Sequence, residues 1–352
     1  MIKRYINNPL ITPEMVRPSM EGYNVLGAFN PGVSLYNGHV ILIMRIPENC
    51  VEQKGFVSVP YYEFKNGEGF PRIRKIARND PDLKLKDTRA VIYKNVEYPS
   101  TVSHLRIARS EDGISFRIED KPFIYPCIGY ESLGVEDARI SKIEDTYYIN
   151  YTAVSGDGFC TMLAETRDFK EVIRKGIIFP PLNKDVAIFE EKIKEKYIAL
   201  HRPHNQWFGR PSVWYAESFD LINWGNHKCL IRPGDDDYEN VKIGGGCAPI
   251  KTKEGWLEIY HSVGDSGKPG TEIYYLNLLL LDLDEPWKVI KRSSSPVMAP
   301  EKNYEKRGFV NNVIFTNGMI VKPDGSVDIY YGACDETICL AQTSVNELLN
   351  ML

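Results

Sequence analysis

The feature that most constrains this chain is a segment repeated five times. Each copy opens on small or polar residues, runs into an apolar strand, turns, and returns as a strand rich in aromatic and β-branched residues. The copies begin at Asn30, Asp137, Asp185, Cys247 and Asn317, and their turns fall at Asn37-Gly38, Glu144-Asp145, Lys194-Glu195, Glu254-Gly255 and Asp324-Gly325. Turn residues at a fixed offset between such strands specify a hairpin, so the pattern predicts five β-hairpins of one design.

A third and a fourth strand are expected after each hairpin. Four third strands lead into a polar turn after an alanine, at Ala108, Ala164, Ala216 and Ala341, whereas the fourth copy carries Leu278–Trp287 instead. Short apolar strands that end in proline close four of the copies, at residues 122–126, 176–180, 229–233 and 296–300. The fifth copy lacks this strand, which residues 9–13 are expected to supply.

Four-stranded units repeated around an axis predict an all-β fold, a five-bladed β-propeller whose last blade is closed by the N-terminal strand. An open β-sandwich with coincidental hairpin spacing is the alternative, and five equivalent hairpins disfavour it. A single catalytic domain then covers residues 1–352. Residues 51–102 interrupt the first blade as a long, charged and irregular insert, typical of a lid or a contact in a homo-oligomer. Residues 344–352 predict a short C-terminal helix capped by Ser344.

Composition argues against several kinds of partner. The 352 residues carry a formal net charge of −4 with no long run of Lys or Arg, so neither nucleic acid nor a membrane surface is expected to bind. The longest apolar run, residues 276–283, is too short to cross a bilayer. The N-terminus lacks the apolar region of a signal peptide, and the seven cysteines form no CxxC pair, so a cytoplasmic location is expected.

Two polar motifs have simpler interpretations than a bound ion or cofactor. The run Asp235-Asp236-Asp237 lacks the glycine and the terminal glutamate of an EF-hand, which favours a solvated loop. Gly244-Gly245-Gly246 has no surrounding βαβ unit, so it is interpreted as a place where backbone approaches a ligand closely. We therefore expect no metal and no organic cofactor.

The ends of the predicted innermost strands gather polar residues at the propeller axis. They are Asn30, Arg45, Asp137, Lys184, Asp185, His201, Arg202, Lys242, His261 and Asp335. Acids, cations and amides in one pocket favour a polyhydroxylated ligand, because each hydroxyl that leaves water needs a donor or an acceptor. Nearby aromatic residues suited to stacking on a sugar face are Tyr130, Trp207, Phe208 and Tyr260.

Five motifs, in order along the chain, then carry a family resemblance. They are Gly-Val-Glu-Asp-Ala-Arg-Ile at 134–140, Asn-Lys-Asp-Val-Ala-Ile-Phe at 183–189, Ala-Leu-His-Arg-Pro at 199–203, Lys-Ile-Gly-Gly-Gly-Cys-Ala-Pro-Ile at 242–250 and Leu-Glu-Ile-Tyr-His-Ser-Val at 257–263. Together they resemble the β-mannoside phosphorylases of glycoside hydrolase family 130. The insert, with Asp87-Thr88-Arg89, and residues 103–113 are similar to the branch that acts on β-1,2-mannobiose and β-1,2-oligomannan.

The resemblance implies inverting phosphorolysis of a β-mannoside to α-mannose 1-phosphate and a shortened acceptor, with inorganic phosphate as co-substrate. Asp137 would be the one catalytic acid, and it is thought in the family to act through the 3-hydroxyl of the mannosyl unit. Residues matching the phosphate site are Lys184, Arg202 and His261; those matching sugar contacts are Asn30, Arg45, Arg89, Asp185, His204, Lys242 and Asp335. The family often has arginine at the position of Lys184 and asparagine at that of Asp185.

Two other functions stay open from the sequence. An inverting hydrolase of the same fold needs a second carboxylate to activate water. Related hydrolases carry that base where this chain has Asn30, which cannot accept a proton. A non-catalytic sugar-binding propeller would keep the pocket without depending on Asp137, which could instead pair with Arg139 or cap a turn. Arg202 in a structural ion pair, and His201 and His204 as scaffold groups, are the corresponding structural interpretations.

Overall fold

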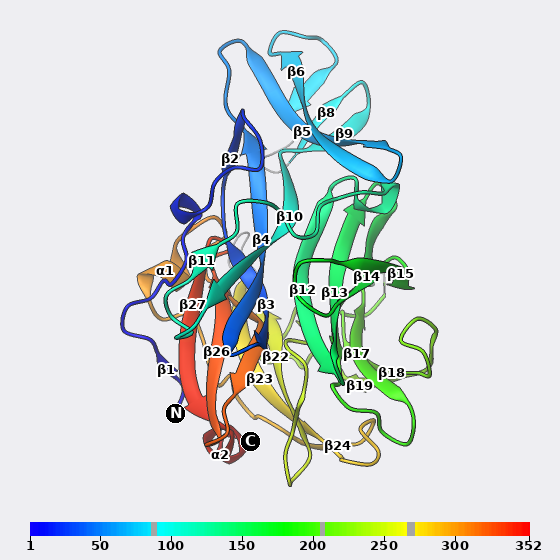
Figure 1. Cartoon of the computed structure of the whole chain (residues 1–352), viewed down its shortest axis with the longest axis vertical. Helices are drawn as coiled ribbons and strands as arrows, with labels where there is room; N and C mark the ends of the chain where they lie inside the picture. The colour runs from blue at the N-terminus through cyan, green and yellow to red at the C-terminus, as the bar shows by residue number, and fades with distance from the viewer. Residues whose placement is uncertain (86–89, 205–207, 266–271) are drawn as a thin grey trace.

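The computed structural model describes residues 1–85, 90–204, 208–265 and 272–352. Within this part the chain is almost entirely β, with two short α-helices, α1 (Asn303–Lys306) and α2 (Val345–Asn350), and two 3-10 turns, η1 (Pro13–Met15) and η2 (Gly129–Glu131). Five antiparallel sheets follow one another along the sequence, and two small sheets lie at one end of the molecule (Figure 1). No helix of the described residues has the length and apolar character to cross a membrane.

The strands are grouped by sheet. Sheet one holds β2 (Tyr23–Val25), β3 (Phe29–Tyr36), β4 (His39–Cys50), β10 (Thr101–Ser110) and β11 (Arg117–Ile118); sheet two holds β12 (Gly134–Ile143), β13 (Thr146–Ser155), β14 (Gly158–Thr166) and β15 (Ile173–Phe179). Sheet three holds β16 (Asn183–Ile188), β17 (Tyr197–Pro203), β18 (Val213–Ser218) and β19 (Trp224–Ile231); sheet four holds β20 (Lys242–Gly244), β21 (Ile250–Lys251), β22 (Trp256–Gly264), β23 (Ile273–Leu281) and β24 (Val289–Arg292). Sheet five holds β25 (Ile314–Val321), β26 (Ser326–Ala333), β27 (Thr337–Ser344) and β1 (Lys3–Arg4).

All five predicted hairpins are present, as β3–β4, β12–β13, β16–β17, β21–β22 and β25–β26. Each turn contains at least one residue with positive φ, such as Asn37 (49°), Glu144 (55°) and Lys194 (50°). Asparagine tolerates this left-handed conformation, and a tight turn requires it. The turns of all five hairpins therefore lie where the sequence predicts them.

The N-terminal segment closes sheet five, as predicted, but its paired residues differ from the expected ones. Strand β1 pairs with β27 through Lys3 and Arg4, whereas residues 9–13 contribute only a bridge between Ile11 and Ile338. Proline has no N–H to donate to a ladder, so a segment bounded by Pro9 and Pro13 cannot extend the pairing. The C-terminal helix is confirmed as α2.

Two of the four predicted outer strands are likewise displaced. Regular pairing occurs in β11 and β24, before the predicted segments, while residues 122–126 and 296–300 provide only single bridges at Ile124 and Met298. The prolines that bound those segments again limit the ladder. Strands β15 and β19 overlap their predicted positions but begin earlier in the chain.

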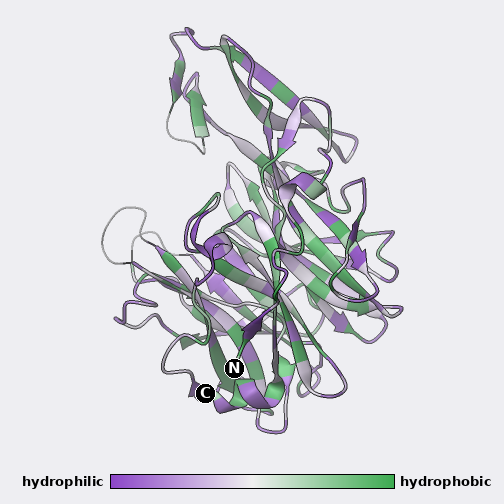
Figure 2. Ribbon diagram, turned by 90° about the vertical axis from the view of Figure 1, so that its left-hand side faces the viewer, coloured by the Kyte–Doolittle hydropathy of each residue, from purple (hydrophilic) through white to green (hydrophobic). Residues whose placement is uncertain are grey.

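The hydrophobic core lies in five layers between neighbouring sheets. Buried residues pack sheet one against two, two against three, three against four, and four against five. A fifth cluster packs sheet five back on sheet one, with Tyr330 and Leu340 against Leu42 and Met44. Hydrophobic and hydrophilic residues alternate along many strands in Figure 2, as strands with two faces of different environment require. The five sheets thus contact one another in a closed cycle.

The insert between β4 and β10 was expected to be irregular. It instead folds into two small sheets of its own. One is the hairpin β5 (Phe56–Lys65) and β6 (Glu68–Ala77), and the other joins β7 (Leu83–Leu85), β8 (Ala90–Tyr93) and β9 (Val96–Pro99). A small core of Val59, Ile76 and Val91 joins the two sheets. Several of the charged residues that suggested a loop, such as Glu63, Lys65 and Lys75, are exposed on these strands.

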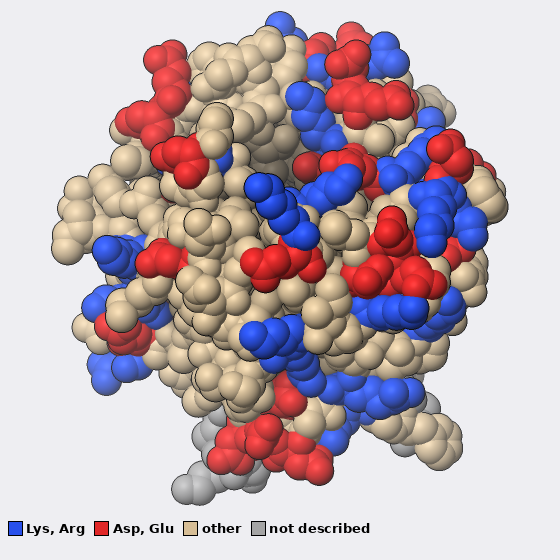
Figure 3. Space-filling view, turned by 90° about the horizontal axis from the view of Figure 1, so that it is seen from below, with Lys and Arg blue, Asp and Glu red and all other residues tan. Residues whose placement is uncertain are grey.

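Charged side chains on the lower face of the molecule are mixed in sign. Lys and Arg are interspersed with Asp and Glu over the surface in Figure 3. That face therefore carries no broad patch of one sign.

Candidate active site

A polar pocket of about 120 Å³ lies where the innermost strands of the sheets begin. Its lining contains nine of the eleven predicted site residues: Asn30, Arg45, Asp137, Lys184, Asp185, Arg202, Lys242, His261 and Asp335. His204 does not line it, and Arg89 lies outside the described residues. Four residues of the lining were not predicted: Tyr274, Val310, Val313 and Phe315.

Four residues of the pocket lining have a left-handed backbone conformation: Asp335, with φ of 51°, and three residues near the starts of inner strands. Asn30, Asp137 and Asp185 have φ of 46°, 50° and 55°, and each stands where the pairing with the next strand shifts register. Asn and Asp tolerate the left-handed region better than other non-glycine residues, and a bulge re-aims the side chain at its position. The repeated Asx residue at the start of β3, β12 and β16 is thus the sequence signal that builds the pocket.

Asp137 is held by an amide and a guanidinium. Its Oδ1 accepts a hydrogen bond from Asn30 Nδ2 at 3.0 Å and lies 3.4 Å from Arg45 Nη1. The same Arg45 donates to Glu136 Oε1 at 2.7 Å, so it is clamped between the two adjacent acids. Burial opposes ionisation of Asp137, but Arg45, Lys184 and the Asn30 hydrogen bond together hold its pKa below the usual value.

Asp185 lies between two arginines. Its Oδ2 accepts from Arg202 Nε at 2.6 Å and lies 3.6 Å from His261 Nε2, while its Oδ1 lies 3.5 Å from Arg139 Nη2. Burial favours the neutral acid, but these neighbours, Arg202 foremost, hold the pKa of Asp185 well below its ordinary range. Burial lowers the pKa of His261 to about 3, so its imidazole is neutral at pH 7 and acts through hydrogen bonds rather than charge.

Two nitrogens of the pocket residues remain available to a ligand. Arg202 Nη1 and His261 Nδ1 are buried and have no hydrogen-bond partner among the described residues. Lys242 Nζ lies 5.2 Å from the centre of the Tyr274 ring, and Lys184 Nζ lies 5.5 Å from that of Phe159. A buried donor without a partner costs free energy, which an anionic ligand would recover.

Asp335 differs from the other two pocket acids. Burial, together with the nearby carboxylates of Asp137 and Glu136, raises the pKa of Asp335 to about 6, against the opposing effect of Arg45. The pocket therefore holds carboxyl groups whose pKa values are shifted in opposite directions. Such a difference is typical of catalytic sites.

The three predicted aromatic contacts that the structure describes do not line the pocket. Tyr260 is fully buried and accepts from Arg292 Nε at 2.7 Å, while Tyr130 and Phe208 are exposed and Trp207 is outside the described residues. Tyr274 and Phe315 line the pocket instead. Phe315 lies two residues before Asn317, which opens the fifth predicted hairpin. Its position next to a hairpin opening was the sequence signal that could have placed it in the pocket.

The glycine run lies against two residues of the pocket lining and against Arg139. A Cβ on Gly244 would lie 2.5 Å from His261 and 2.6 Å from Asp185, and the carbonyls of Gly245 and Gly246 accept from Arg139. Among the described residues, no cluster of three or more His, Cys, Asp or Glu suits a metal ion.

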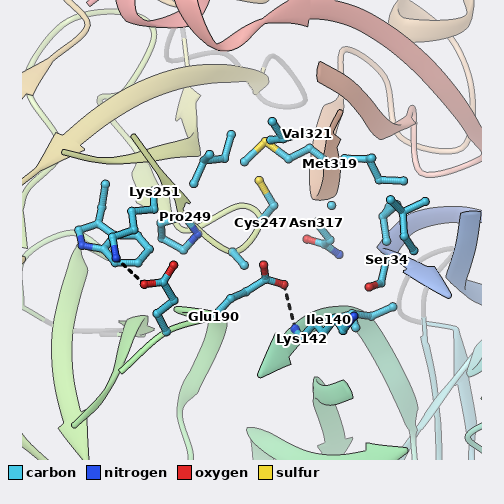
Figure 4. A pocket seen from close by; sticks show the side chains of 18 residues that line it. Ser34, Ile140, Lys142, Glu190, Cys247, Pro249, Lys251, Asn317, Met319 and Val321 are labelled. Atoms are coloured by element: carbon cyan, nitrogen blue, oxygen red, sulfur yellow. Dashed lines mark hydrogen bonds and ion pairs between the residues drawn. The ribbon is translucent and has the colours of Figure 1, made fainter. Parts of the chain in front are cut away.

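A second, larger pocket of about 370 Å³ is lined further along the same innermost strands (Figure 4). Ile140 and Lys142 of β12 and Asn317 and Met319 of β25 contribute to it. Asn317 Nδ2 donates to the carbonyl of Asn30 at 3.1 Å. The two pockets thus lie at different levels along β3 and β12.

Comparison with known proteins agrees with these observations. A family profile described as beta-1,4-mannooligosaccharide phosphorylase, that of glycoside hydrolase family 130, matches residues 77–352. The Beta-1,2-mannobiose phosphorylase of Listeria innocua is 42% identical over 100% of this chain and 98% of its own. The 1,2-beta-oligomannan phosphorylase of a Thermoanaerobacter species is 38% identical over 72% of this chain and 83% of its own.

Solved structures give the same result. The structure of the Listeria innocua enzyme in complex with beta-1,2-mannobiose superposes with a TM-score of 0.91 at 40% identity, covering 100% of this chain and 99% of that one. A second structure comes from work on family 130 glycoside hydrolases that target beta-1,2 mannosidic linkages in Candida mannan. It is 21% identical to this chain and shares its fold, with a TM-score of 0.74 over 98% of this chain and 94% of that one. The protein is therefore a glycoside phosphorylase. It belongs to glycoside hydrolase family 130.

Proposed function

We propose that the five sheets are the blades of a five-bladed β-propeller, with residues 1–352 as one catalytic domain. The support is the closed cycle of five core layers and the pairing of β1 with β27, which joins the two ends of the ring. The pocket at the starts of the innermost strands is then the axial site.

The proposed reaction is inverting phosphorolysis of a β-mannoside, in particular β-1,2-mannobiose or β-1,2-oligomannan. A phosphate oxygen attacks the anomeric carbon as the glycosidic bond breaks, and the leaving oxygen takes a proton. The products are α-mannose 1-phosphate and an acceptor shortened by one mannose. The relatives that match the chain over most of its length, named as β-1,2-mannoside phosphorylases, support this substrate class.

One observation carries the choice of phosphate over water: the opening position of β3 holds Asn30, which donates to Asp137 instead of acting as a second carboxylate. No base is needed when the nucleophile is already an anion. The unpartnered Arg202 Nη1, beside Lys184 and His261 in the same lining, provides donors for that anion. We assign phosphate to these three residues.

Asp137 is assigned the proton transfer, delivered through the 3-hydroxyl of the mannosyl unit. In the free protein, Arg45 and Lys184 keep this carboxyl ionised. A bound phosphate dianion next to Lys184 would offset that positive charge and raise the pKa of Asp137 toward the range a general acid needs. The acid would therefore be protonated only when phosphate is bound.

The remaining pocket residues, Asn30, Arg45, Asp185, Lys242 and Asp335, are assigned to the mannosyl unit. Arg89 and His204 are assigned to the acceptor side. The insert is assigned a lid or a homo-oligomer contact. A cytoplasmic location is proposed because all seven cysteines are unpaired and five are buried.

The test is to incubate the protein with phosphate and a panel of mannobioses of different linkage and to assay mannose 1-phosphate. We expect product from the β-1,2 isomer, formed only when phosphate is present. Release of free mannose at the same rate without phosphate would establish the hydrolase instead. Sugar affinity without turnover under any condition would establish a binding protein.

A further inference from the structure

Arg139 lies beneath the pocket without lining it. Its side chain is buried, with 2% of its surface exposed. Nη1 donates to the carbonyl of Asp137 at 3.3 Å, and Nη2 contacts the carbonyl of Gly245 at 2.9 Å and Asp185 Oδ1 at 3.5 Å. Nε donates to the carbonyl of Gly246. One guanidinium thus binds groups from β12, from β16 and from the segment after β20.

The contacts of Arg139 extend on both sides. Asp185, which faces Arg139 with Oδ1, binds Arg202 with Oδ2 at 2.6 Å. On the other side, Gly246 N donates to Glu258 Oε1 at 2.9 Å. This N–H and the Gly245 carbonyl that Arg139 binds belong to the same peptide group, so a buried carboxyl of β22 helps to hold that carbonyl in place. The Phe315 ring lies 5.9 Å from the guanidinium carbon and forms part of the pocket lining.

We propose that Arg139 is a positioning residue that sets the distance between the proton donor Asp137 and the Asp185–Arg202 pair. The inference rests on the proposed function, since it assigns those groups to acid and phosphate. Asp137 and Asp185 both adopt left-handed backbone conformations that cost free energy and persist only when their surroundings fix them. Arg139 binds the backbone of one and the side chain of the other, and so fixes both from the same planar group.

Lysine cannot replace this arrangement. A guanidinium presents several N–H groups in a fixed plane, whereas an ammonium is a point charge on a flexible stem. Arg139→Lys therefore keeps the charge and removes the simultaneous contacts to β12, β16 and the Gly245–Gly246 carbonyls. A displacement of about 1 Å between reacting groups can cost about 100-fold in rate.

The experiment compares Arg139→Lys with Arg174→Lys. Arg174 is a matched control, because it also binds a buried carboxylate, Glu131, and a carbonyl, that of Tyr125, at the outer edge of sheet two. Both variants are expected to lose thermal stability. At a temperature well below either midpoint, Arg139→Lys should lose about 100-fold in kcat and show a raised KM for phosphate, while Arg174→Lys keeps the wild-type values.

Chemical rescue separates positioning from stability. In Arg139→Ala, added guanidinium ion at low millimolar concentration should recover part of the lost kcat. The melting temperature of the variant should recover less of its own loss. Glu258→Asp shortens the side chain by one methylene and so weakens the hydrogen bond from Gly246 N. We expect a smaller loss of kcat, about 10-fold. This variant serves as the test if the Arg139 variants do not fold.

Two results would overturn the proposal: wild-type kcat in folded Arg139→Lys, or wild-type kcat in folded Glu258→Asp where the Arg139 variants do not fold. Failure of the proposed function gives a different result, since the wild-type protein itself would then release no mannose 1-phosphate.

Discussion

Residue 137 allows a clean test of the proton donor, because asparagine adopts the left-handed conformation as readily as aspartate and Asn30 already occupies the matching position in β3. Asp137→Asn should fold normally and lose at least about 1,000-fold in kcat, within the range of general acid catalysis. The measurement is release of mannose 1-phosphate, with Asp145→Asn, at the exposed turn of the same hairpin, as the control. Turnover near the wild-type rate would exclude Asp137 as the acid.

Asp335 makes the stability of the protein depend on pH. Its pKa is about 6 in the folded state and about 3.9 when unfolded. Between those values the folded state binds more protons, so the free energy of unfolding falls as pH rises from about 4 to 6. Asp335→Asn removes this fall and should be more stable than wild type at pH 7 by on the order of 2 kcal/mol, yet similar at pH 3. Urea unfolding at both pH values measures this difference, and equal stability at pH 7 would contradict the raised pKa.

Most of the site could be predicted from the sequence, because the repeat places one Asx residue at each of the first three hairpin openings. The interactions of those residues could not. From the sequence, Arg139 was considered a partner for the Asp137 carboxylate. In the structure it binds the backbone carbonyl of Asp137 and the carbonyls of Gly245 and Gly246, which are more than 100 positions further along the chain. Such contacts depend on how sheets pack against one another, and local patterns carry no information about that packing.

Among the elements, the turn after the third strand recurs with one set of hydrogen bonds. In sheet three, Asp220 Oδ1 accepts from the backbone N–H groups of Ile222 and Asn223, and Ser218 Oγ accepts from Leu221 N. Asp112 and Asp168 make the same pair of bonds in sheets one and two. Backbone hydrogen bonds lower the pKa of all three carboxyls. Their contribution to stability is therefore present above pH 4 and is lost as pH falls further.

Asp220→Ala should lower the melting temperature by roughly 2–4 °C at pH 7 and leave kcat unchanged, since the turn is remote from the pocket. Asp220→Asn, which keeps an acceptor oxygen, should lose less. Thermal unfolding followed by circular dichroism measures both variants. An unchanged midpoint in Asp220→Ala would mean that the turn is fixed by packing alone.

Strands were predictable to different degrees for a physical reason. Inner hairpins carry both turn residues and alternating apolar positions, so their existence and the places of their turns followed from the sequence. Outer strands are short, as in β11 (Arg117–Ile118), and their segments contain prolines that pair only once. The insert was mistaken for a loop because its charged residues alternate on narrow, two-sided sheets that bury little.

For the whole molecule, we propose the insert as the contact with another copy of the chain. Its sheets expose several large apolar side chains, among them Phe56, Leu85 and Val96. Exposed large apolar side chains lose their contact with water when a second protein surface covers them. We expect the wild-type protein to sediment as a multiple of 40.2 kDa and Leu85→Asp with Val96→Asp to sediment as the single chain. A wild-type monomer would leave the insert with the role of a lid alone.

Pairing of β1 with β27 has a consequence for synthesis in the cell. Ring closure joins residues 3 and 4 to residues 341 and 342, and Asp335 lies just before this last strand. A ribosome adds about 5–20 residues per second, so the first hairpin waits roughly 15–70 seconds for the strand that completes the ring. A nascent chain that has emerged through sheet four already carries Asp137, Arg139 and Arg202, but it has no closed pocket. The pocket lining is therefore complete only once Phe315 and Asp335 have been made, when translation is nearly finished.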